Sequence, residues 1–136
     1  MSFNCFFKYY MCMKPVNIEE VRGFLDHRAK QHKKLLMKRL DLAQRDFDRI
    51  IQRIIDKYYP LRIFQWGSLL HPEDFSEISD IDIAVEGIAS TEQFFSLLSE
   101  ADELTDFPLD IVELEKIHPL HAESIRKKGK IVYERS

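Results

Sequence analysis

Residues 79–85 read Ser-Asp-Ile-Asp-Ile-Ala-Val, with acidic or small residues alternating with β-branched ones. Side chains two positions apart in a β-strand point to the same face of the sheet. A strand over residues 80–86 therefore places Asp80 and Asp82 on one face and the β-branched residues on the other. Two adjacent carboxylates repel each other and are costly to bury, so this strand indicates a site that binds a divalent cation.

A turn precedes this strand. The stretch from Leu61 to Trp66, with Ile63 and Phe64 in a short apolar run, predicts a strand. Gly67-Ser68 predicts a turn after it, and a polar loop follows from His71 to Ser79. Glycine lets the backbone approach a phosphate closely, and the serine adds a hydroxyl and an N–H donor. A short helix beginning at Leu69 would add an N-terminus that favours anions.

A third acid follows in the sequence. Asp110 stands in the apolar run from Pro108 to Val112, which predicts another strand. If this strand lies beside residues 80–86, three carboxylates converge. Three such acids can hold two metal ions roughly 4 Å apart, which is the geometry of in-line phosphoryl or nucleotidyl displacement.

The remaining pattern indicates an α+β fold, a small mixed β-sheet flanked by helices, with a long N-terminal helix. Apolar residues recur at helical spacing from Ile18 to Tyr58, which predicts one long helix, or two with a break in the basic stretch 27–39. The other predicted elements are an N-cap at Asn17, a helix capped by Ser90 with Gln93 three residues on, a helix over 118–128 capped by Gly129, and a strand over 130–133.

We predict that residues 17–136 form a single domain, with one long helix or two helices over 17–59 and the catalytic core over 60–136. Residues 1–16 are predicted to be a disordered or non-native extension.

The 136-residue chain has a net charge of −3 and two cysteines, Cys5 and Cys12, which is typical of a cytoplasmic protein. No apolar run is long enough to span a bilayer, and the basic stretch is interpreted as a solvated helix face, so neither membrane nor nucleic acid is expected as a partner.

Residues 64–68, 79–85 and 108–112, with the ending from Ile125 to Glu134, resemble the signature of the DNA polymerase beta-like nucleotidyltransferases. The similarity is greatest to the minimal nucleotidyltransferase group. The resemblance implies a mixed sheet flanked by helices. It also implies transfer of a nucleoside monophosphate from a nucleoside triphosphate to a hydroxyl, with pyrophosphate leaving.

The resemblance also assigns roles to residues. Gly67 and Ser68 would hold the triphosphate, with Ser79 also at the nucleotide. Asp80, Asp82 and Asp110 would be the catalytic, metal-binding residues for two Mg²⁺ ions. His71 occupies the position where the family often has an arginine, so it is expected to donate to a phosphate less effectively.

Many small members of the group are antitoxins that adenylylate a tyrosine of a HEPN-type ribonuclease toxin using ATP, and the resemblance implies this role here. Two alternatives stay open. The chain could neutralise its toxin by binding alone, with the long helix masking the partner or pairing with a second copy. It could also act on a small molecule, although so short a chain leaves little room for a second, acceptor-binding domain.

Overall fold

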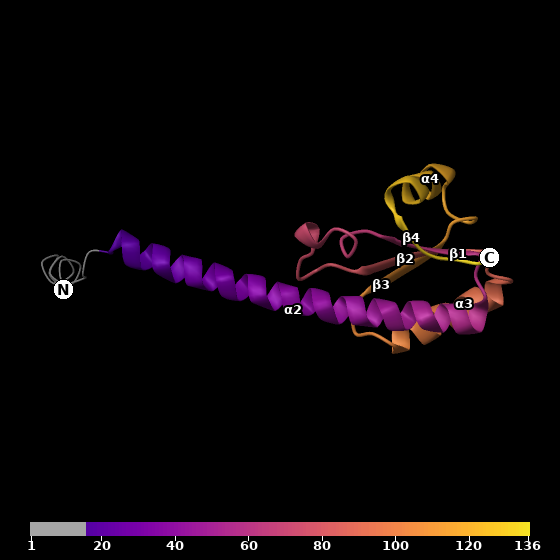
Figure 1. Cartoon of the computed structure of the whole chain (residues 1–136), viewed down its shortest axis with the longest axis horizontal. Helices are drawn as coiled ribbons and strands as arrows, with labels where there is room; N and C mark the ends of the chain where they lie inside the picture. Colours follow the sequence, from indigo (N-terminus) through magenta and orange to yellow (C-terminus); the bar gives the residue numbers. More distant parts are fainter. Residues whose placement is uncertain (1–15) are drawn as a thin grey trace, which may run out of the picture. The chain divides into compact units, whose positions relative to one another are not determined.

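A computed structural model describes residues 16–136, and its internal contacts divide the chain after Leu35 into two units. The predicted extension over residues 1–16 lies almost wholly outside the described residues, so it stays a prediction. The elements, labelled in Figure 1, are α2 (Ile18–Tyr58), β1 (Arg62–Trp66), the 3₁₀ turn η1 (Pro72–Asp74), β2 (Ile81–Glu86), α3 (Thr91–Glu103), β3 (Leu109–Glu113), α4 (Pro119–Lys128) and β4 (Lys130–Glu134).

Helix α2 is one continuous helix of 41 residues, which decides between the two predicted forms. Asn17 caps it as predicted, because its Oδ1 accepts a hydrogen bond from the backbone N–H of Glu19 at 3.0 Å. The side chains of residues 16–35 are all exposed. The buried residues of the helix all lie in the second unit: Ala43, Phe47, Ile50, Ile51, Ile54 and Tyr58.

The second unit, residues 36–136, contains a four-stranded mixed sheet with the order β3-β2-β1-β4. Strand β1 pairs antiparallel with both β2 and β4. Strand β2 pairs parallel with β3, and α3 forms the crossover between them. The predicted fold class, a mixed sheet flanked by helices, is confirmed.

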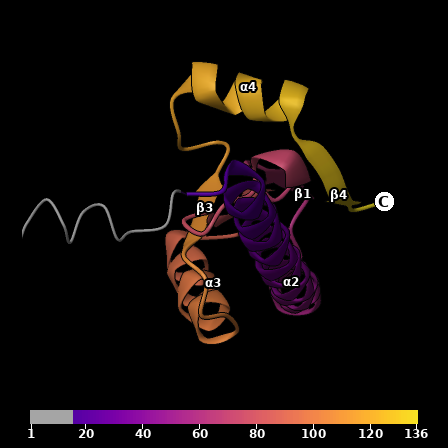
Figure 2. The same ribbon diagram turned by 90° about the vertical axis from the view of Figure 1, so that its left-hand side faces the viewer.

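Helices cover both faces of the sheet, with α4 on one face and α3 and the C-terminal part of α2 on the other (Figures 1 and 2). The predicted alternation in β2 determines which side chains meet which helix. Ile81, Ile83 and Val85 belong to the larger core with α2 and α3, whereas Ala84 packs with Ala122 and Ile125 of α4.

Two details between β1 and β2 differ from the sequence predictions. No helix begins at Leu69: the chain makes consecutive turns, with Leu70 N donating to Gly67 O at 3.2 Å and His71 N to Ser68 O at 3.1 Å. Pro72 explains the short turn, because the residue before a proline is disfavoured in the helical region. Strand β2 also begins one residue later than predicted, at Ile81, which leaves Asp80 at the end of the preceding loop.

Gly129 ends α4 as predicted, but not through a left-handed backbone. Its φ is −75°, and its N–H donates to Ile125 O at 2.7 Å. A Cβ at this position would lie 2.5 Å from Ile125 O and 3.0 Å from Gln65 O. The glycine is therefore required because two backbone carbonyls, first that of Ile125 in α4 and then that of Gln65 in β1, leave no room for a Cβ, and not because of its dihedral angles.

Candidate active site

The three predicted acids lie at one edge of the sheet. Asp82 and Asp110 are register partners in the parallel β2–β3 pair, so their side chains leave the same face of the sheet. Asp80 directly precedes β2 and is close enough to affect Asp82 electrostatically. We call this group of Asp80, Asp82 and Asp110 the acidic edge. Asp82 is buried, Asp80 is half-buried and Asp110 is exposed.

Burial and like charge act on Asp82 in the same direction. Burial, and after it the nearby carboxylates of Asp110 and Asp80, together raise the pKa of Asp82 to about 6. A raised carboxyl pKa means that the surroundings disfavour the ionised form. The acidic edge therefore carries an unbalanced negative charge that a bound cation would neutralise.

This donor set fits Mg²⁺ that arrives with a nucleotide. Among residues 16–136, no group of three or more His, Cys, Asp or Glu side chains is arranged as a metal-binding cluster. Mg²⁺ commonly uses only one or two carboxylates and completes its shell with waters and substrate phosphates. The carboxylates of Asp82 and Asp110 lie on a common face and can supply these one or two ligands. The raised pKa of Asp82 shows that the surroundings disfavour its negative charge, which a bound Mg²⁺ would compensate.

The Gly-Ser turn lies directly against the acidic edge. Trp66 is the antiparallel partner of Asp82, and Gly67 follows it with a φ of +77°. A Cβ on Gly67 would collide with the carboxylate of Asp82 and would lie 2.7 Å from its Cγ. The glycine thus allows the backbone of the turn to touch the acid, in the arrangement that the sequence predicted for phosphate and metal binding.

The other predicted nucleotide-binding residues lie in or beside the loop between β1 and β2. The hydroxyl of Ser79 is buried and accepts a hydrogen bond from Ser76 N at 2.8 Å, so in this structure it holds the loop closed. His71 is exposed, with its Nδ1 3.8 Å from Glu73 Oε1. Ser68 is half-buried and follows Gly67 in the turn. Contact of these three residues with a nucleotide stays a prediction.

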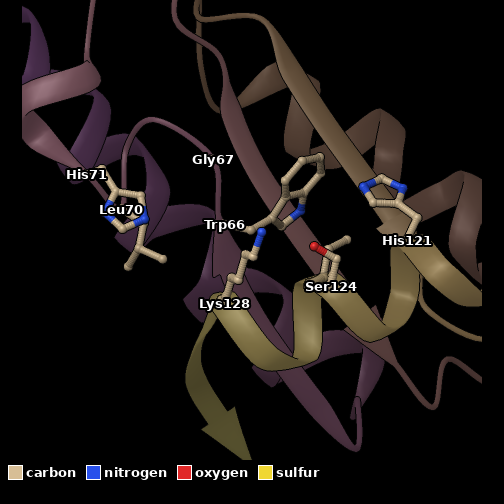
Figure 3. Close-up of a pocket in the computed structure, with 9 residues that line it drawn as sticks. Trp66, Gly67, Leu70, His71, His121, Ser124 and Lys128 are labelled. Atoms are coloured by element: carbon tan, nitrogen blue, oxygen red, sulfur yellow. The ribbon is translucent and has the colours of Figure 1, made fainter.

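A cavity of about 250 Å³ opens beside Gly67, between the turn and α4 (Figure 3). We call it the α4 cavity. Trp66 and His121 meet there edge to face, with ring centroids 5.4 Å apart. Its lining residues are Trp66, Gly67, Leu70, His71, His121, Ser124, Ile125, Lys128 and Gly129.

Sequence reasoning missed the part of this cavity that α4 supplies. His121, Ser124, Ile125 and Lys128 are spaced three, one and three residues apart, so they share one helix face. That spacing is visible in the sequence. It could not be connected to Gly67 without knowing that α4 crosses the sheet over β1.

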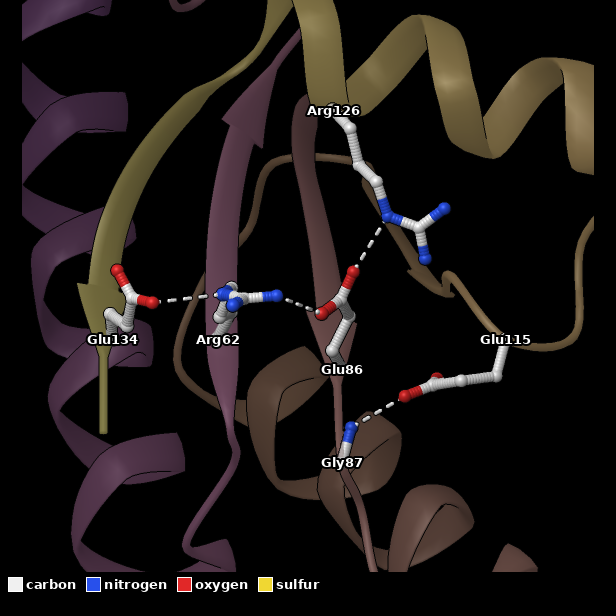
Figure 4. Close-up of polar contacts among 6 residues, drawn as sticks. All are labelled: Arg62, Glu86, Gly87, Glu115, Arg126 and Glu134. Atoms are coloured by element: carbon white, nitrogen blue, oxygen red, sulfur yellow. Dashed lines mark hydrogen bonds and ion pairs between the residues drawn. The ribbon is translucent and has the colours of Figure 1, made fainter. Parts of the chain in front are cut away.

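A buried carboxylate fixes α4 to the sheet (Figure 4). Glu86 of β2 accepts hydrogen bonds from Arg126 Nε at 2.8 Å and from Arg62 NH1 at 3.2 Å, while Arg62 Nε reaches Glu134 Oε1 at 3.1 Å. The side chain of Glu86 is only 7% exposed, so these pairs are partly shielded from solvent. The network connects three strands to α4 and thereby positions the cavity wall.

Comparisons with known proteins agree with this geometry. Residues 49–136 match the family described as "Polymerase beta, Nucleotidyltransferase". No curated protein matches the chain. A chain in the crystal structure of a toxin–antitoxin MntA–HepT complex is similar at 22% identity, over 68% of this chain and 73% of that one, with a TM-score of 0.51.

Two further solved structures share the fold. A structure of a tri-AMPylated Shewanella oneidensis HEPN toxin in complex with its MNT antitoxin matches at 22% identity, over 68% of this chain and 73% of the other, with a TM-score of 0.51. A toxin–antitoxin structure with AMP-PNP matches at 22% identity, over 65% and 73% of the two chains, with a TM-score of 0.52. In the part of the chain that the structure describes, no helix is suited to cross a membrane. Because the family match covers well over half of the sequence, the chain belongs to the polymerase beta nucleotidyltransferase family.

Proposed function

We propose that this nucleotidyltransferase transfers AMP from ATP to a hydroxyl, and that the acceptor is a tyrosine of a partner HEPN ribonuclease toxin. The observation that carries the proposal is the pairing of Asp82 with Asp110 in register, beside the Gly67 turn. Two of the similar structures are complexes of an antitoxin with its toxin, and in one of them the HEPN toxin is AMPylated. They support a HEPN toxin as the acceptor. The similar structure with AMP-PNP supports ATP as the donor.

The roles divide among the residues by their position. Asp80, Asp82 and Asp110 would hold Mg²⁺, which supplies charge neutralisation at the phosphates when bound. Asp110 is the exposed acid, so it is the one best placed to accept the proton of an incoming hydroxyl. The acceptor oxygen forms a bond to the α-phosphorus, the bond to the bridging oxygen breaks, and pyrophosphate leaves. Gly67 and Ser68 would orient the triphosphate for that in-line displacement.

The test is transfer of radiolabelled AMP from α-labelled ATP, in Mg²⁺, to a purified HEPN-type toxin as the proposed partner. Label should appear on the toxin, disappear with EDTA, and disappear in Asp82→Asn and Asp110→Asn. Glu103→Gln removes an exposed acid outside the acidic edge and should leave transfer intact. A wild-type protein that binds no Mg²⁺–nucleotide, together with acid variants that change nothing, would refute the proposal.

A second candidate, neutralisation by binding alone, is favoured by the exposed apolar residues of α2. Ile18, Val21, Phe24, Leu25 and Leu35 are between 40% and 71% exposed. Such a row of apolar residues is suited to a partner surface or to a second copy of the chain. Neutralisation of the toxin that survives Asp80→Asn, Asp82→Asn and Asp110→Asn together would favour binding over modification.

A further inference from the structure

The α4 cavity and the acidic edge are continuous through one residue. Gly67 touches the Asp82 carboxylate and also lines the cavity. Gly67 has no side chain, so a ligand that passes from the acidic edge to the cavity would meet only backbone at this residue. The volume of about 250 Å³ equals that of several water molecules at roughly 30 Å³ each, so it can admit phosphate groups.

The chemistry of the cavity favours an anion. No carboxylate is among its lining residues, and Lys128 is the lining side chain with a fixed positive charge at neutral pH. Ser124, one helical turn before Lys128, lines the same cavity and adds a hydroxyl donor (Figure 3).

The position of Lys128 is set by the packing of α4. Arg126, two residues earlier, is held by Glu86, and Gly129, one residue later, lies close to Gln65 O. The adjacent Lys127 pairs instead with Glu123 at 2.9 Å and does not line the cavity. Two neighbouring lysines of the same helix thus differ in whether they reach the cavity, and this gives a matched pair for experiment.

We propose that the α4 cavity binds the β- and γ-phosphates of the nucleoside triphosphate, with Lys128 as their cationic contact and Ser124 as a hydroxyl donor. The inference rests on the proposed nucleotidyl transfer and adds a specificity residue to it. The triphosphate then spans two oppositely charged regions, with its α-phosphate at the acidic edge and its terminal phosphates in the cavity. Lys128 thereby makes the site selective for triphosphate over monophosphate.

The experiment is calorimetric binding of Mg²⁺–AMP-PNP and of AMP to the full chain. Lys128→Ala should weaken AMP-PNP binding roughly tenfold or more, as expected for the loss of one charge-assisted contact, while AMP binding stays unchanged. Lys128→Arg should restore most of the affinity for AMP-PNP. Lys127→Ala should bind both ligands as the wild type does, and its unchanged unfolding temperature would serve as the folding reference.

Two outcomes would overturn the inference. Equal AMP-PNP affinity in Lys128→Ala and Lys127→Ala would show that Lys128 makes no phosphate contact. An equal loss of AMP and AMP-PNP affinity in Lys128→Ala would place the contact at the nucleoside or α-phosphate. In both cases the proposed function would still hold if Asp82→Asn abolishes transfer. A wild-type chain that binds no nucleotide would instead refute both the proposed function and the role of Lys128.

Discussion

The Cα of Gly67 lies against the carboxylate of Asp82, so closely that this position has no room for a side chain. The turn and the acidic edge are therefore a single structural unit. Gly87 offers a comparison, because it also has a positive φ, of +79°, and a Cβ there would lie 2.7 Å from the Cβ of Leu61. The two glycines share their backbone conformation and differ in what they touch.

Replacing Gly67 by alanine should therefore impair both stability and chemistry. The left-handed backbone costs a non-glycine residue about 1–2 kcal/mol, and the added methyl group displaces the Asp82 carboxylate. We expect Gly67→Ala to lower the unfolding free energy and to lose transfer and Mg²⁺–nucleotide binding. Gly87→Ala should lose comparable stability but retain binding in the folded fraction. Denaturant titration with calorimetry on both variants measures this, and equal binding by both would contradict it.

Asp82→Asn should stabilise the protein at neutral pH while it removes activity. The pKa of Asp82 is raised from 3.8 to about 6 by burial, then by Asp110 and Asp80, so the native state binds its proton more tightly than the unfolded state. Stability therefore falls as pH rises from about 4 to about 6 and stays lowered above that range. The asparagine variant lacks this ionisation. Its melting temperature should exceed that of the wild type above about pH 7, and the gap should close below about pH 4.

Added Mg²⁺ provides the control for this pH dependence. It should raise the melting temperature of the wild type at neutral pH, because it compensates the charge of Asp82, and should raise that of Asp82→Asn less. A gap in melting temperature that is independent of pH would show that the raised pKa does not affect stability. A Mg²⁺ effect of equal size in both proteins would place the ion elsewhere.

Glu86→Gln should weaken the attachment of α4 to the sheet and lower the unfolding free energy. The substitution keeps the size of the side chain but removes the charge that two arginines share, at a site only 7% exposed. Because Arg62 and Arg126 are 39% and 47% exposed, solvent replaces part of the loss, and we expect a destabilisation of about 1–3 kcal/mol. Glu123→Gln breaks the exposed pair with Lys127 and should cost less than about 0.5 kcal/mol. Urea unfolding of both variants distinguishes them, and similar midpoints would argue against the network.

Removing residues 1–35 should leave the second unit folded. Residues 18–35 of α2 are exposed throughout, whereas the core side chains of the helix begin at Ala43. Little apolar surface is therefore lost with the segment, and the melting temperature of residues 36–136 should stay within a few degrees of the full chain. Differential scanning calorimetry tests this. Ile54→Ala is the opposite case, because truncating this buried side chain should lower the unfolding free energy by about 2–5 kcal/mol. A truncated chain that fails to fold would show that the first unit contributes to the core.

Local patterns in the sequence were sufficient for much of the fold. Strict alternation over residues 81–85 predicted which side chains share a face of the sheet, because the strand period has only two possible phases. The structure adds which of the two faces meets α4. Ser90 predicted the start of α3, and its hydroxyl accepts from Gln93 N at 3.1 Å. The same alternation, with Asp110 in a similar apolar run, predicted that the acids share a face, and the β2–β3 register places Asp82 opposite Asp110.

Features that depend on long-range packing could not be predicted in this way. The α4 cavity requires knowing where α4 crosses the sheet, and nothing within residues 119–128 specifies that crossing. The need for glycine at residue 129 was only partly predictable, because one of the two carbonyls that exclude a Cβ there, that of Gln65, lies in a strand distant in the sequence. The absence of a helix after Gly67 follows from Pro72, whose steric effect on His71 outweighs the helical preference of the two leucines.

The parallel register of β2 and β3 has a consequence for how this site tolerates change. Ile81 N donates to Pro108 O at 2.9 Å, which fixes where β3 starts relative to β2. Lengthening the connection around α3 costs little, since loop-closure entropy grows slowly with length. Inserting or deleting one residue inside β3 before Asp110 would instead turn the third carboxylate toward the aliphatic layer beneath the sheet. The face on which Asp110 lies therefore depends on whether the number of residues before it in β3 is odd or even. At these positions of β3 a substitution preserves the face, whereas an insertion or deletion of one residue reverses it.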